Sequence, residues 1–92
     1  MAKYFLFGKY SVEALKGISS DRTKKFIELA EKLGGKVISI DVTLGCKDLV
    51  IAVDMPNTSA VMKLSIGMAK ISGIGFTSSP AVSVEEFDKM MG

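Results

Sequence analysis

Four polar side chains stand where a strand or a turn can present them to a small molecule. Tyr4 lies in an aromatic segment near the start, Ser39 and Asp41 alternate along a later apolar segment, and Asp48 follows a glycine-containing turn. A hydroxyl can orient a ligand, and a carboxylate shielded from water can act as a general acid or base. These four residues are the candidate ligand-binding residues, and no catalytic residue is assigned.

Each candidate also has a structural interpretation. Asp48 can accept backbone N–H bonds inside the turn, which is a common role for aspartate. Asp41 can lie on a solvated strand face or at the polar edge of an interface. Tyr4 can bury its ring and place its hydroxyl at a rim. The residue types alone leave both interpretations open.

Histidine is absent and cysteine occurs once, at Cys46. The chain therefore lacks the commonest general base near neutral pH and the commonest metal ligand. A zinc site would need carboxylates alone, so we expect no metal and no cofactor. A single cysteine cannot form an internal disulfide and suits a reducing compartment, and we expect the protein to be cytoplasmic.

The charge pattern argues against nucleic acid and membrane partners. Twelve basic and ten acidic residues give a net charge of +2, and the basic residues are scattered except at 22–25. Phosphate-backbone binding needs a patch or stripe of basic residues. No run approaches the ~20 apolar residues of a membrane-spanning helix, and the N-terminus lacks the apolar region of a signal peptide.

Hydrophobic periodicity predicts strands over 3–10, 36–44, 48–54 and 74–80. It predicts a helical turn from Ser11, helices over 21–33 and 57–72, and a short C-terminal helix after Ser83. Ser11, Asp21, Asn57 and Ser83 are the expected N-caps, and Gly73 is an expected stop. This order is that of a ferredoxin-like βαββαβ fold, α+β in class, with both crossover helices on one face of an antiparallel sheet. Residues 1–92 form a single domain.

Three local features are expected within that fold. The alternation in 36–44 places Ile38, Ile40, Val42 and Leu44 on one face of their strand. A tight turn at Gly45–Cys46 joins this strand to the next as an antiparallel hairpin. Gly67 lets its helix approach the sheet closely.

The segment "LVIAV" (49–53) is apolar on both faces, as is the first strand, and 48% of all residues are hydrophobic. Two helices can cover only one face of the sheet, and soluble monomers rarely expose contiguous apolar patches. We therefore expect a homodimer or a higher oligomer, with a second copy packed sheet on sheet. The alternative is a monomer whose C-terminal helix folds across the free face.

Three segments carry a family resemblance: "MAKYFLFGKYSVEALKGI", "LGGK" and "LGCKDLVIAVDMPN". From Lys3 to about Pro80 the chain resembles the GYD-domain family, small proteins of the dimeric α/β-barrel type. Gly45 and Asp48 match the glycine and aspartate of the family's name, while Lys47 stands where its tyrosine is expected. The resemblance implies a ferredoxin-like fold and self-association. It implies no activity, although the wider group includes cofactor-independent monooxygenases.

Three functions are therefore compared. The first is a homo-oligomer that binds a small apolar or amphipathic molecule in a cleft between sheet and helices, lined by Tyr4, Ser39, Asp41 and their neighbours. The second is a cofactor-independent, monooxygenase- or isomerase-like enzyme with Asp41 or Asp48 as its base, an inference from fold alone. The third is a structural or regulatory assembly protein without a ligand.

Overall fold

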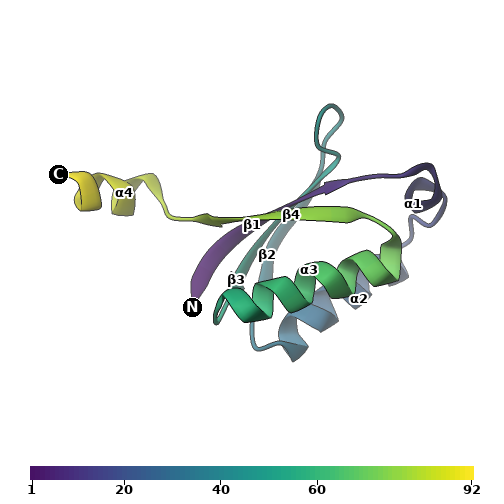
Figure 1. Ribbon diagram of the computed structural model, residues 1–92, viewed down its shortest axis with the longest axis horizontal. Coiled ribbons are helices and arrows are strands. Elements are labelled where there is room, and N and C mark those ends of the chain that lie inside the picture. Colours follow the sequence, from purple (N-terminus) through teal and green to yellow (C-terminus); the bar gives the residue numbers. More distant parts are fainter.

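Four strands form one antiparallel sheet, and two of the helices cover a single face of it (Figure 1). The computed structural model describes all residues, 1–92. In chain order the elements are β1 (Ala2–Lys9), α1 (Val12–Lys16), α2 (Ser20–Lys32), β2 (Lys36–Val42), β3 (Leu49–Met55), α3 (Thr58–Ser72), β4 (Gly75–Ala81) and α4 (Val84–Met91). The strands lie in the order β2-β3-β1-β4, with every neighbouring pair antiparallel. The α+β, ferredoxin-like prediction is confirmed.

Side-chain caps define where the helices begin. The predicted caps Ser11, Asn57 and Ser83 each accept a hydrogen bond from a backbone N–H in the first turn of their helix. Helix α2 differs, because Ser19 is its cap and accepts from the backbone N–H of Arg22 at 3.1 Å. The predicted cap Asp21 lies instead in the first turn, where a negative charge stabilises the helix dipole.

The core lies between the sheet and the helices α2 and α3. Its fully buried large side chains come from β1, β3, α3 and the residue just before β4: Leu6, Ile51, Val53, Met55, Val61, Leu64, Met68 and Ile74. Burying a side chain of this size contributes about 1.5–3 kcal/mol. Gly67 of α3 approaches α2 and not the sheet, since a β-carbon there would lie 2.6 Å from Leu29 Cδ2. The prediction that Gly67 lets α3 approach the sheet was therefore wrong, because the element close to Gly67 is α2.

A β-bulge changes the expected alternation of β2. Pairing passes from Val37↔Val53 directly to Ser39↔Ala52, which leaves Ile38 without a partner. The extra residue places Val37 on the same face as Ile40, and both pack against the core. The predicted face is thus correct for Ile40 but wrong for Ile38, which is 49% exposed.

The connection from β2 to β3 is a longer loop than the predicted tight turn. The backbone N–H of Thr43 donates to the Asp48 carbonyl oxygen at 2.8 Å, and the Thr43 hydroxyl donates to the Lys47 carbonyl at 2.6 Å. Leu44 at the start of this loop is 93% exposed and belongs to neither face of the sheet. The antiparallel hairpin itself is confirmed.

Helix α4 stands apart from the rest of the molecule. It projects past the end of β4, at the opposite end of the long axis from α1 (Figure 1), and none of its residues is buried. The face of the sheet opposite α2 and α3 is therefore left without a covering helix.

Candidate functional site

The uncovered face of the sheet, here called the open face, carries an apolar centre between polar edges. Strand pairing places Ser39, Ala52, Phe5 and Ser79 in one row, and Asp41, Val50, Phe7 and Thr77 in the next. The two central strands thus supply the apolar members of both rows. The edge strands β2 and β4 supply the polar ones.

The apolar centre of the open face is separate from the core. Phe5, Phe7 and Val50 are only half-buried, and none of them belongs to the core cluster or packs against it. Helix α4 does not cover them, contrary to the alternative in which it folds across the sheet. Contiguous apolar surface of this kind is uncommon on soluble monomers and marks contact sites.

A cleft opens on the other face, between α2 and the sheet. Its volume is about 110 Å³. Its walls are mainly apolar, and its lining consists of Tyr10, Ile18, Ser19, Arg22, Thr23, Phe26, Ile40, Val42 and Leu49. Phe26 is held there by an edge-on contact with Phe76, with ring centroids 6.2 Å apart. The hydroxyl and guanidinium groups in this lining make the observed cleft amphipathic. A cleft between the sheet and the helices was also predicted from the sequence.

Arg22 provides the only charge in the lining of this cleft. Its Nη1 donates to the Ala14 carbonyl oxygen at 2.7 Å, and its guanidinium lies 6.0 Å from the centre of the Tyr10 ring. Arg22 forms no ion pair, because the single pair in the chain joins Lys9 and Asp48. Guanidinium N–H groups not used by Ala14 therefore remain for an anion.

The sheet separates the residues that were expected to share a cleft. Tyr4 points to the helices, is 9% exposed, and lies 3.3 Å from Thr58 Oγ1 through its hydroxyl oxygen. Ser39 and Asp41 lie on the open face and line no cavity. The predicted cleft that contains all three is therefore not formed, because strand alternation places Tyr4 on the opposite side. A ligand role for each one alone stays a prediction.

Sequence reasoning missed Arg22 and Phe26 as cleft residues. Arg22 was counted only as part of the basic group at 22–25, and Phe26 was not considered as a ligand contact. Their spacing of four residues places both on one helical face. An arginine on the core-facing stripe of an amphipathic helix is the signal that would have pointed to this cleft.

The family model of the GYD domain matches residues 4–91, which is nearly the whole chain. The chain belongs to the GYD domain family. A search of curated proteins finds no match to it.

The hairpin of this GYD domain is tied to the cleft through Asp48. Asp48 Oδ2 accepts a hydrogen bond from the Tyr10 backbone N–H at 2.9 Å and lies 3.7 Å from Lys9 Nζ. The Lys9 ammonium also donates to the Gly45 carbonyl oxygen at 3.1 Å. Asp48 thus joins the hairpin loop to the end of β1 and fixes Tyr10 at the cleft. Lys47, at the position where the family's tyrosine was expected, is exposed.

No group of three or more His, Cys, Asp or Glu side chains in this GYD domain has a geometry that could hold a metal ion. None of its helices has the length and apolar character needed to cross a membrane. Asp41 and Asp48, the two carboxylates considered as a base, do not line any of its cavities. Of its three cavities, the cleft beside Arg22 has the most apolar lining.

Proposed function

We propose that this GYD domain is a self-associating protein that binds a small amphipathic anion in the cleft between α2 and the sheet. The observation that carries the binding proposal is the Arg22 guanidinium, which forms no ion pair and stands beside an apolar cleft. Binding sites for small molecules commonly combine apolar walls with a few polar groups that fix orientation.

The size of the cleft limits its ligand. At about 110 Å³ it is smaller than the roughly 150 Å³ cavity that accepts benzene. Only the apolar end of a molecule enters, between Phe26, Ile40 and Leu49. The head group stays at the rim, where Arg22 and the Ser19 hydroxyl can donate hydrogen bonds. A short branched carboxylate has this combination of size and charge.

Self-association is supported by the open face. Its apolar centre of Phe5, Phe7, Val50 and Ala52 has no covering element within the chain. A second copy related by a twofold axis presents the same surface, so apolar centres meet and polar edges meet. The two sheets then pack face to face about 10 Å apart.

Calorimetric titration with two ligands of the same shape tests the binding proposal. Isovalerate carries a carboxylate, and isovaleramide carries a neutral amide in its place. We expect the wild-type chain to bind isovalerate at least about tenfold more tightly than isovaleramide, because a charged hydrogen bond to arginine contributes about 1.5–3 kcal/mol. Arg22→Gln should remove this preference.

Two results would contradict the proposal. One is the absence of any heat of binding with either compound at millimolar concentration. The other is equal isovalerate affinity in wild type and Arg22→Gln. Circular dichroism of Arg22→Gln serves as the control, since this variant also loses the bond to the Ala14 carbonyl.

A further inference from the structure

Helix α4 carries an apolar face that nothing in its own chain covers. Val84, Phe87, Met90 and Met91 are 51–74% exposed. At 100° per residue these four side chains fall within about one third of the helix circumference. Glu86 and Asp88 flank this apolar face on its two sides. The helix is therefore amphipathic, with acidic borders, and its apolar face lacks a partner.

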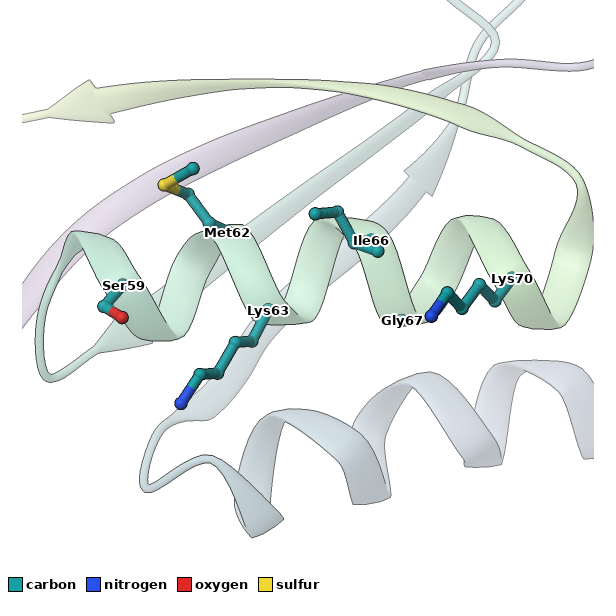
Figure 2. Close-up of a pocket in the computed structure, with 6 residues that line it drawn as sticks. All are labelled: Ser59, Met62, Lys63, Ile66, Gly67 and Lys70. Carbon is teal, nitrogen blue, oxygen red and sulfur yellow. The ribbon is translucent and has the colours of Figure 1, made fainter.

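A groove of matching character runs along the outer surface of α3 (Figure 2). It has a volume of about 370 Å³ and is lined by Ser59, Met62, Lys63, Ile66, Gly67 and Lys70. Met62 and Ile66 are more than half exposed and lie on the side nearer β4, whereas Lys63 reaches toward α2 (Figure 2). Gly67 lines the groove on the side of α2, where a β-carbon would meet Leu29.

The charges of the two helices are complementary. Helix α3 contains Lys63 and Lys70 and no acidic residue, which gives it a net charge of +2. Helix α4 contains three acidic residues and Lys89, which gives a net charge of −2. We propose that α4 of one copy docks into this α3 groove of another copy, with Phe87 on Met62 and Ile66 and one acidic border beside the lysines.

The groove cannot be filled by α4 of the same chain. Only Val82 and Ser83 link β4 to α4, and two residues span at most about 7 Å. The groove lies on the outward side of α3, so α4 would have to pass around a helix about 10–12 Å thick. The groove and the open face lie on opposite sides of the molecule, so this contact is a second interface and does not rest on the first.

Sedimentation velocity with charge-reversed variants tests the docking. We expect Lys63→Glu with Lys70→Glu to weaken the assembly at least about tenfold, and removal of residues 82–92 to lower the average mass by about half. The truncated chain keeps its core, because α4 buries no residue. Adding Glu86→Lys and Asp88→Lys to the lysine variant should restore the contact. The matched control is Lys16→Glu with Lys47→Glu, which carries the same charge change elsewhere and should assemble as wild type does.

Disulfide trapping identifies the contact directly. In a Cys46→Ser background, chains with Ile66→Cys are mixed with chains with Phe87→Cys and oxidised. We expect the mixed disulfide dimer to form at least tenfold faster than in a control mixture of Leu44→Cys and Phe87→Cys chains. Equal rates in the two mixtures overturn the proposal, as does a truncated chain that sediments like wild type. Unchanged assembly on open-face substitution, with trapping intact, contradicts only the sheet-on-sheet contact.

Discussion

Phe5 and Phe7 stack on the open face of the sheet, with ring centroids 6.1 Å apart and ring planes inclined by 24°. The Lys3 ammonium lies 5.2 Å from the centre of the Phe5 ring, at one end of this pair. Both rings lie on the central strand β1, and the apolar residues Val50 and Ala52 lie beside them on β3. The stack is thus the middle of an ordered apolar surface that no helix of the chain covers.

Replacing Asp48 by alanine should destabilise the fold without preventing it. The variant loses the bond from the Tyr10 backbone N–H and the contact with Lys9. A hydrogen bond to a charged group contributes about 1.5–3 kcal/mol, so we expect the free energy of unfolding to fall by about that amount. Urea denaturation measures it. Asp48→Asn keeps an acceptor oxygen, so its free energy of unfolding should fall by less than that of Asp48→Ala. Equal stability of Asp48→Ala and wild type would show that the loop does not depend on this carboxylate.

Gly35 and Gly75 should respond in opposite ways to alanine. A β-carbon at Gly35 would overlap the Met55 sulfur and the Asp54 carbonyl oxygen, and the backbone cannot move aside easily. We expect Gly35→Ala to lower the free energy of unfolding by about 1–3 kcal/mol, the usual range for overpacking. At Gly75 a β-carbon meets no atom within 4 Å, so Gly75→Ala should be neutral or slightly stabilising. Thermal unfolding of both variants compares them, and equal shifts in Tm would contradict the packing described at Gly35.

Filling the cleft should block the proposed ligand. Ile40 lines the cleft from the edge strand β2 and is only half-buried, so a phenylalanine there can occupy the cleft. We expect Ile40→Phe to weaken isovalerate binding at least about tenfold while the free energy of unfolding changes by less than about 1.5 kcal/mol. Ile27→Phe on α2 is the matched control, since Ile27 does not line the cleft. Undiminished binding in Ile40→Phe would place the ligand elsewhere.

Much of the fold follows from local signals in the sequence. Asn57 and Ser83 begin their helices and Gly73 ends its helix as expected, because a capping side chain or a left-handed glycine satisfies backbone groups within one turn. The bulge at Ile38 could not be predicted, because an uninterrupted alternation of apolar residues carries no sign of an extra residue. Asp21 was predicted as the cap of α2, whereas the cap is Ser19; both residue types cap well.

The candidate site was harder to predict than the fold. Tyr4 and Asp41 were grouped by chemistry, whereas strand pairing decides which face each one occupies. Asp48 accepts a backbone N–H as its structural alternative supposed, but the donor is Tyr10 at the end of β1 and not a residue of the turn. Arg22 was missed because its importance depends on Ile40 and Leu49, which reach the cleft from two other elements.

Self-association through the open face is the central claim, and sedimentation velocity of the full-length chain tests it most directly. The comparison is between wild type and Phe5→Lys with Phe7→Lys, with Val12→Lys on α1 as an exposed control. We expect wild type to sediment as two copies or more, and the double variant to weaken the association at least about 30-fold, because losing buried aromatic anchors costs about 2 kcal/mol or more. A wild-type chain that sediments as one folded copy at several hundred micromolar would contradict the claim.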